Sequence, residues 1–200
     1  MQSHAEKIEK LLSMPRAFSA REATAYGIPH AILSYNCKRG KIARVGRGLY
    51  ASTRLQPTSY PDLAQLAAKQ TDFVVCLLSA LRIHEFTTQL PTSLWIAVRQ
   101  GARMPSIAPW PLSCIHLNKT PYEYGIEEHE IDGLKIKVYS AAKTVADCFK
   151  FRNKIGLDVA LEALREGVRL KLFTIAELDA AAEVCRVSNV MRPYMETILS

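Results

Sequence analysis

Residues 18–51 read FSAREATAYGIPHAILSYNCKRGKIARVGRGLYA, and this stretch decides the fold of the first part of the chain. Ser19 followed by Glu22 is a capping-box pattern, which predicts that a short helix begins here and ends at Gly27. The segment HAILSYNCKR then predicts another helix, with Gly40 well placed to end it. Two helices separated by a turn that contains glycine are the pattern of a helix-turn-helix.

Two short strand-like runs follow these helices, KIARV and GLYAS, joined through Gly46, Arg47 and Gly48. A short, glycine-rich connection of this kind predicts a tight β-hairpin. Upstream, Ser3 and Glu6 form another capping box, which predicts an additional helix at the start of the chain. Three helices followed by a hairpin are the element order of a winged helix-turn-helix.

The rest of the chain mixes strand-like and helical patterns. The apolar run at 71–85 predicts a buried helix, whereas residues 93–99 and 113–118 predict strands. Asp132 and Gly133 lie between two further strand-like runs and predict a hairpin. The remaining C-terminal part is helical in its pattern.

The predicted fold class is therefore α+β, with an N-terminal winged helix-turn-helix at 1–56 and an α/β domain at 62–200 that has a small sheet and several helices. Residues 53–62, TRLQPTSYPD, contain two prolines and several polar residues and predict a linker. The two domains differ in charge. Residues 1–56 carry ten Lys and Arg against three Asp and Glu, a balance of +7, whereas residues 57–200 carry sixteen of each. A basic first domain predicts an anionic partner.

The basic segment at 38–51 has two interpretations. A run of charge is often only a solvated face, but this run follows a helix-turn-helix pattern and lies on a predicted hairpin. Arg44 and Arg47 would project from such a wing toward phosphates or the minor groove. Ile32 and Leu33 can pack inward, which leaves the other face of their helix able to read base edges. The candidate DNA-binding residues are Arg21, His30, Ser34, Tyr35, Lys38, Arg39, Lys41, Arg44 and Arg47.

The sequence also argues against zinc binding, disulfides, a membrane span and a signal peptide. The five cysteines are widely spaced among apolar neighbours and form no CxxC, which favours buried, reduced thiols over zinc ligands or disulfides. No apolar run reaches the roughly 18 residues that a membrane span needs. The polar N-terminus, MQSHAEKIEK, lacks the apolar core of a signal peptide, so we expect a cytoplasmic protein. No metal and no cofactor are predicted.

An enzymatic interpretation would rest on the cluster Glu127, Glu128, His129, Glu130 and Asp132, which could in principle bind a metal. A metal-dependent nuclease needs carboxylates and a lysine that converge on a metal-bound water. The sequence has no D…ExK pattern, and alternating exposure on a surface hairpin explains these charges equally well. We therefore predict that the protein is not an enzyme.

The chain resembles a known family in three stretches. Residues 18–51 look like the N-terminal domain of AbiEi-type antitoxins, and the resemblance continues in VCLLSALRIHEFTTQLPTSLWIAV and YSAAKTVADCFKFRNKIGLDVALEALREG. It implies a DNA-binding autorepressor of a bacterial type IV toxin–antitoxin system. The implied partners are double-stranded DNA, at inverted repeats in a promoter, and an AbiEii-like toxin with a nucleotidyltransferase fold. One departure is Asn36, where the family pattern has an aromatic or aliphatic residue.

The third of these stretches contains Lys143 and Asp147, four residues apart, which a helix would place on one face. The residues alone suggest an ion pair worth some tenths of a kcal/mol. The resemblance instead implies a part in antitoxicity. The candidates for that role are Lys143, Asp147, Lys150, Arg152 and Lys154.

Two alternatives to an antitoxin stay open from the sequence. One is a ligand-responsive winged-helix regulator, whose second domain would bind a small molecule. The other is an enzyme that the wing delivers to DNA. A toxin gene immediately downstream would favour the antitoxin, and a metabolic operon would favour the ligand-responsive regulator.

Overall fold

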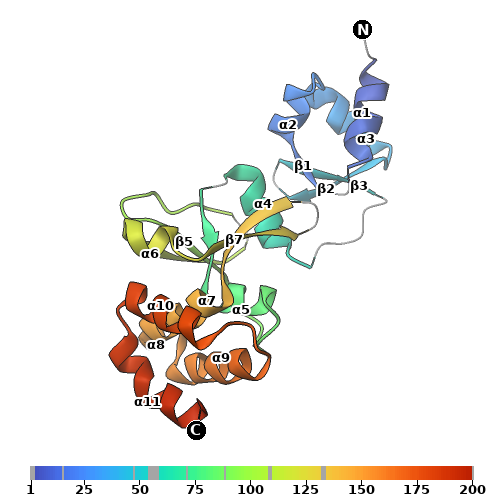
Figure 1. The fold of residues 1–200 in the computed structure, drawn as a ribbon. Coiled ribbons are helices and arrows are strands. Elements are labelled where there is room, and N and C mark those ends of the chain that lie inside the picture. Colours follow the sequence, from blue (N-terminus) through green and yellow to red (C-terminus); the bar gives the residue numbers. More distant parts are fainter. Residues whose placement is uncertain are drawn as a thin grey trace. The chain divides into compact units, whose positions relative to one another are not determined.

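The computed structural model describes residues 3–14, 16–46, 48–53, 59–70, 72–87, 89–107, 110–131 and 134–199. Its contacts divide the chain into two compact units, one formed by Met1–Thr71 with His129–Ile136 and the other by Asp72–Glu128 with Lys137–Ser200. The predicted mixture of helix and sheet in each part is confirmed (Figure 1). The predicted domain limits, 1–56 and 62–200, stay a prediction.

The first unit begins with the predicted helices and hairpin, and its strands form a three-stranded sheet in the order β1-β3-β2. The elements are α1 (His4–Leu12), β1 (Phe18–Ser19), α2 (Ala20–Ala25), α3 (His30–Lys38), β2 (Ile42–Gly46) and β3 (Leu49–Ser52). This is the element order of a winged helix-turn-helix, with β2 and β3 as the wing. The helices close on a core of Ile8, Leu11, Phe18, Ala23, Ile28, Leu33, Ile42 and Tyr50.

The two predicted capping boxes of this unit differ in the structure. At α1 both halves form, because the Glu6 amide donates to Ser3 and the Ser3 amide donates to the Glu6 carboxylate. At α2 only Ser19 caps, and accepts from the amide of Glu22 at 3.0 Å. The carboxylate of Glu22 is instead bound by the guanidinium of Arg16. An ion pair has therefore replaced the second half of the capping box.

The predicted linker at 53–62 ends in a helix, α4 (Pro61–Lys69), with its proline at a first-turn position where the missing amide costs nothing. Residues 54–58 of that linker lie outside the described residues. Ala64 of α4 packs with Leu49 of the wing and with Leu134 in a small apolar cluster. The side chain of Gln65 on α4 also lies close to the wing, since a Cβ on Gly46 would lie 3.3 Å from its Oε1. In the structure α4 is therefore part of the first unit.

The second unit contains most of a mixed five-stranded sheet in the order β6-β5-β4-β8-β7. Strand β4 pairs antiparallel with β5 and parallel with β8, and β5 and β6 are parallel. The strands are β4 (Val74–Val75), β5 (Leu94–Arg99), β6 (Leu112–Leu117), β7 (Ile126–Ile131) and β8 (Leu134–Tyr139). Strands β5 and β6 confirm the two predicted strands. The turn predicted at Asp132 and Gly133 lies outside the described residues.

The helix predicted at 71–85 is wrong in its first half. The chain there forms β4, and helix α5 (Leu77–Ile83) begins only afterwards. Val74 and Val75 are β-branched and fully buried, which suits the centre of a sheet better than a helix. A short apolar run buried on all sides does not distinguish a strand from a helix by its period.

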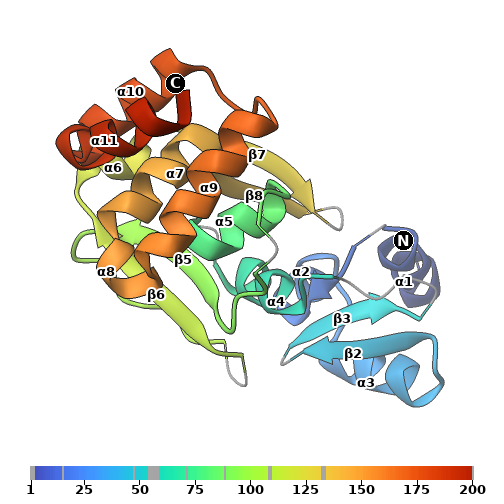
Figure 2. The same cartoon turned by 90° about the horizontal axis from the view of Figure 1, so that it is seen from below.

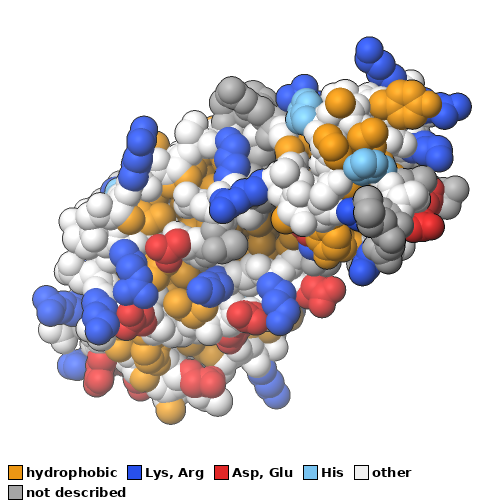
Figure 3. All heavy atoms as spheres, turned by 90° about the horizontal axis from the view of Figure 1, so that it is seen from above, with side chains coloured by type: hydrophobic (Ala, Val, Ile, Leu, Met, Phe, Trp, Pro, Cys, Tyr) orange, Lys and Arg blue, Asp and Glu red, His pale blue; other side chains and the backbone are white. Residues whose placement is uncertain are grey.

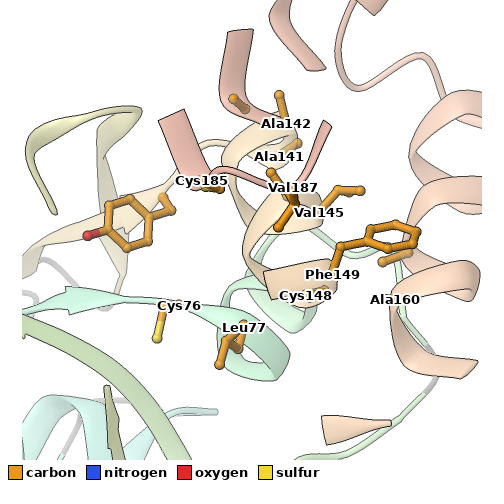
Figure 4. Close-up of a cluster of buried hydrophobic side chains, with 14 of the residues drawn as sticks. Cys76, Leu77, Ala141, Ala142, Val145, Cys148, Phe149, Ala160, Cys185 and Val187 are labelled. Atoms are coloured by element: carbon orange, nitrogen blue, oxygen red, sulfur yellow. The ribbon is translucent and has the colours of Figure 1, made fainter. Parts of the chain in front are cut away.

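The helices of the second unit cover the sheet, and α7 and α9 run side by side in Figure 2. Besides α5, they are α6 (Lys119–Glu123), α7 (Ala141–Lys150), α8 (Arg152–Ile155), α9 (Leu157–Arg169), α10 (Ile175–Cys185) and α11 (Ser188–Leu199). Helix α7 is central, because every residue from Ala141 to Phe149 is buried. Figure 4 shows Phe149 of α7 beside Ala160 of α9 within this core. Among the described residues, no helix is long and apolar enough to cross a membrane.

Candidate nucleic-acid interface

Helix α3 has one face toward the core and one toward solvent, as a recognition helix requires. Leu33 and Asn36 are its buried residues, while His30, Tyr35 and Lys38 are exposed. The amide Nδ2 of Asn36 donates to the backbone oxygen of Ile32 at 2.8 Å, so this buried polar group is satisfied. Asn36 therefore occupies an inward position, where the resemblance led us to expect an aromatic or aliphatic residue, and it does not lie on the outward face.

The N-terminal turn of α3 is tied to the wing sheet through His30. Its Nε2 lies 3.3 Å from the hydroxyl of Tyr50, which is buried on β3, and its Nδ1 lies 3.5 Å from the hydroxyl of Ser34. Both ring nitrogens thus already have partners within the protein. His30 is placed to fix α3 against the wing as well as to face DNA.

The C-terminal turn of α3 carries a cation beside an aromatic ring. A guanidinium N–H of Arg39 donates to the hydroxyl of Tyr35 at 2.9 Å, and the guanidinium carbon lies 5.4 Å from the ring centroid. The Tyr35 side chain is 54% exposed, which is unusual for an aromatic residue in a small domain. An exposed ring with a held guanidinium can stack on or hydrogen-bond to a base or a sugar-phosphate.

The other candidates lie on α2, after α3 and on the wing. Arg21, Lys38, Lys41 and Arg44 are all exposed. The Nε of Arg44 donates to the backbone oxygen of Gly46 at 3.4 Å, across an irregularity in the pairing of β2 with β3. Arg47 lies outside the described residues.

The residues of α3 and of the wing themselves carry charge of a single sign. Residues 23–61 contain no Asp and no Glu, so neither α3 nor the described wing strands bring a carboxylate to this surface. Figure 3 shows Lys and Arg side chains around the first unit on the face in view, with His side chains among them and Asp or Glu side chains at one edge. A solvated surface with no binding role usually intersperses both signs. A cluster of exposed cations on one helix and its neighbouring strands is what binding to a polyanion requires.

The structure divides the five antitoxicity candidates into buried and accessible residues. Lys143 and Asp147 are 0% and 1% exposed, and Nζ lies 2.5 Å from Oδ2. The expected ion pair on one helix face is therefore present, but it lies inside the core, where neither side chain is accessible to another protein. Lys150 and Lys154 are exposed, and Arg152 is half-buried with one N–H donated to the backbone oxygen of Phe149.

The surroundings of the buried pair show how the core accommodates it. The ammonium of Lys143 lies 4.2 Å from the ring centroid of Tyr139, and the thiol of Cys185 donates to Oδ1 of Asp147 at 3.3 Å. Burial raises the pKa of the Asp147 carboxyl, and Lys143 opposes that rise. The pair joins α7 to the end of α10 and to β8.

The cluster considered for a metal-dependent enzyme lies on β7. Glu127, Glu128 and Glu130 are exposed and His129 is half-buried, while Asp132 lies outside the described residues.

Comparison with known proteins agrees with this picture. A family model described as "Transcriptional regulator, AbiEi antitoxin" matches residues 6–53, which hold nearly all of the three helices and both strands of the wing. Among solved structures, the RV2827C protein from Mycobacterium tuberculosis is similar over 92% of this chain and 82% of its own, with a TM-score of 0.53 and 10% sequence identity. At that identity the likeness concerns the fold alone. The search of curated proteins found no match. Residues 6–53 are thus an AbiEi-type segment, which confirms the resemblance that the sequence indicated.

Proposed function

We propose that the protein binds double-stranded DNA through α3 and the wing and represses its own operon as the antitoxin of a type IV toxin–antitoxin system. One observation carries the DNA-binding part of this proposal. It is the exposed surface of α3, β2 and their flanks, which is rich in cations and receives no carboxylate from residues 23–61.

The exposed residues of this surface have different expected tasks. Tyr35 and Lys38 project from α3 and are expected to contact base edges in the major groove. Lys41 and Arg44 are expected to contact phosphates, which give affinity but no sequence information. Arg47, which lies outside the described residues, is proposed for the same task from its place in the sequence. The proposed operator is an inverted repeat, because regulators of this kind commonly act as pairs on two half-sites.

The antitoxin part of the proposal rests on the description of the matching family. The proposed toxin is an AbiEii-like nucleotidyltransferase. Of the five candidate residues, Lys150, Arg152 and Lys154 reach the surface, so they are the ones proposed to act in antitoxicity. Lys143 and Asp147 are proposed to support that surface from within the core.

A DNA titration with a matched pair of variants tests the first part. The DNA is the promoter upstream of the protein's own gene, and binding is followed by fluorescence anisotropy at several salt concentrations. Lys41→Ala with Arg44→Ala should weaken binding and flatten the log–log salt dependence by about 0.9 for each lost phosphate contact. Arg165→Ala with Lys171→Ala removes the same charge from exposed sites of the second unit and should change little. Equal losses in both variants would contradict the proposed interface.

Toxin rescue tests the second part independently. The toxin is co-expressed from a promoter that this protein does not repress, so that repression cannot explain survival. The wing variant should keep rescue, whereas Lys150→Ala with Lys154→Ala should lose it and keep DNA binding. Rescue that follows DNA binding in every variant would show that the second unit has no separate role.

A ligand-responsive regulator is the second candidate function. The observation that favours it is a cavity of about 360 Å³ in the first unit, lined by residues of α2, β3 and α4. The sequence alone had placed such a ligand in the second domain instead.

A further inference from the structure

Strand β6 ends the five-stranded sheet, so among the described strands it has a neighbour on one side only (Figure 2). On that side it runs parallel to β5. The backbone oxygens of Pro111 and Leu117 accept hydrogen bonds from amides on the β5 side. Because the backbone groups of successive residues in a strand point to alternate sides, the odd-numbered residues of β6 face β5.

The even-numbered residues of β6 are Leu112, Cys114 and His116, and their backbone N–H and C=O groups point away from β5. No backbone hydrogen bond joins these groups to any other part of the chain that the structure describes. None of the three residues is buried. A row of such groups along a strand is a template for the addition of another strand. We name the N–H and C=O groups of these three residues the open edge.

The two edge strands of this sheet differ in charge. The strand at the other end, β7, carries Glu127, Glu128 and Glu130, which are all exposed. Such charges oppose the pairing of two identical edges, because like charges would then face each other. Strand β6 reads LSCIHL and contains no Lys, Arg, Asp or Glu and no proline. The sheet is therefore protected against self-pairing at β7 but not at β6.

Two copies of β6 can form an antiparallel pair that is symmetric about Cys114. A two-fold axis at this residue places Cys114 opposite Cys114 of the partner subunit, and Leu112 opposite His116 of the partner subunit. In this register the N–H and C=O groups of the open edge on one copy meet those on the other, so that all of them are paired. No charged residue of one strand faces a charged residue of the other.

An exposed aromatic side chain flanks the open edge. Trp110 precedes β6 by two residues and is 40% exposed. In the antiparallel pair it lies beside the far end of the partner's strand, where its ring loses contact with water. Tryptophan is enriched at protein–protein interfaces. A second copy therefore covers an apolar side chain as well as the hydrogen-bonding groups of the edge.

We propose that two copies of the chain associate through β6, antiparallel about Cys114, and thereby join their sheets into one. The dimer would contain two DNA-binding units, the number that an inverted repeat requires. The proposal does not rest on DNA binding, because the association is measured without DNA.

Sedimentation velocity of the full chain, at concentrations from about 5 to 500 µM, tests the association. We expect a dimer with a Kd of roughly 10–100 µM, since the contact lies at the small end of specific interfaces. Cys114→Lys places two ammonium groups opposite each other at the axis and should weaken the dimer at least tenfold. Cys114→Ser leaves the edge uncharged, and Ala176→Lys adds the same charge to an exposed site on α10. Both of these controls should dimerise like the unmodified chain.

Two outcomes of this experiment would overturn the proposal. One is a chain that stays monomeric at about 500 µM, which would leave the open edge to a strand of another protein. The other is a dimer that Cys114→Lys does not weaken, because the copies would then meet through another surface. Circular dichroism shows whether Cys114→Lys is folded.

A thiol cross-link locates the contact without that variant. In a hydrogen-bonded antiparallel pair the two opposite Cα atoms lie about 5.5 Å apart, a separation that dibromobimane can bridge. This reagent becomes fluorescent once it has reacted with two thiols. In a Cys37→Ser variant, Cys114 is the accessible thiol, because Cys76, Cys148 and Cys185 are buried. This variant should give a fluorescent covalent dimer that disappears when Cys114→Ser is added. A dimer in sedimentation that gives no such cross-link would contradict pairing about Cys114.

Discussion

The ammonium of Lys143 and the carboxylate of Asp147 form an ion pair inside the core of the second unit, where both side chains are almost fully enclosed. Each charge depends on the other, because a lone charge in an apolar core is far more costly than a pair. If the ammonium of Lys143 were removed, the hydrogen bond from the Cys185 thiol to Asp147 could not replace it, because a thiol carries no positive charge.

The first prediction follows from this pair. Lys143→Met leaves the carboxylate of Asp147 buried without its counter-ion and should lower the free energy of unfolding by about 3–5 kcal/mol. The double variant Lys143→Met with Asp147→Leu should recover most of that loss. Lys150→Met, at the exposed end of the same helix, is the control and should change little. Urea denaturation followed by circular dichroism measures the free energy of unfolding of the three variants. An unchanged free energy of unfolding for Lys143→Met would contradict the account of a buried ion pair.

The second prediction concerns which residues of α3 read sequence. Tyr35→Ala and Lys38→Ala should each change the preferred base at one operator position, at roughly 1–3 kcal/mol per lost contact. His30→Ala should differ from them, because His30 also contacts Tyr50 and thereby holds α3 against the wing. We expect it to reduce both thermal stability and DNA affinity. Binding-site selection from a random DNA pool tests whether these residues read the base sequence. An unchanged consensus sequence for Tyr35→Ala would exclude Tyr35 from that role.

The third prediction concerns the extent of the DNA-binding unit. A fragment that ends at residue 56 lacks α4, and with it Ala64, so Leu49 and Ala51 lose part of their apolar cover. A fragment that ends at residue 70 keeps α4. We expect the longer fragment to unfold at a higher temperature and to bind promoter DNA more tightly, because its wing is supported. Equal melting temperatures for the two fragments would show that α4 contributes nothing to the wing.

The fourth prediction concerns the thiols. Burial raises the pKa of Cys185 to about 12, and it also raises the pKa of Cys76 and Cys148, so all three stay protonated near pH 8. In the folded protein a thiol reagent at pH 8 should label only Cys37 and Cys114, which are half-buried. Mass spectrometry of labelled peptides, before and after unfolding in urea, gives the answer. Rapid labelling of Cys185 in the folded protein would mean that the end of α10 opens readily.

Local sequence signals predicted the parts of the fold that depend on neighbouring residues. The capping box at Ser3, the ends of α3 and the two strands of the wing are all decided within a few positions of the chain. The exposed cations of the candidate interface could also be found, because their signal is the lack of acidic residues over a long stretch.

Features that depend on distant partners could not be predicted in the same way. Lys143 and Asp147 have the spacing of an ordinary surface pair, and only the packing of α7 against α9 and α10 encloses them. Glu22 has the right position for a capping box, but Arg16 binds it instead. The short strand β4 is indistinguishable from helix by period, since its neighbours in the sheet, Ala97 and Val138, lie far away in the chain.

The return of residues 129–136 to the first unit has a consequence for how the protein is made. A ribosome finishes residues 1–71 long before it reaches residue 136, and domains generally fold as units while they emerge. At an elongation rate of about 5–20 residues per second, several seconds separate these two points. During that interval Leu134 is missing from its cluster with Leu49 and Ala64. A nascent chain halted shortly after α4 therefore lacks a residue that completes the apolar cluster beside the wing, and this part of the first unit can form only after residue 136 has been translated.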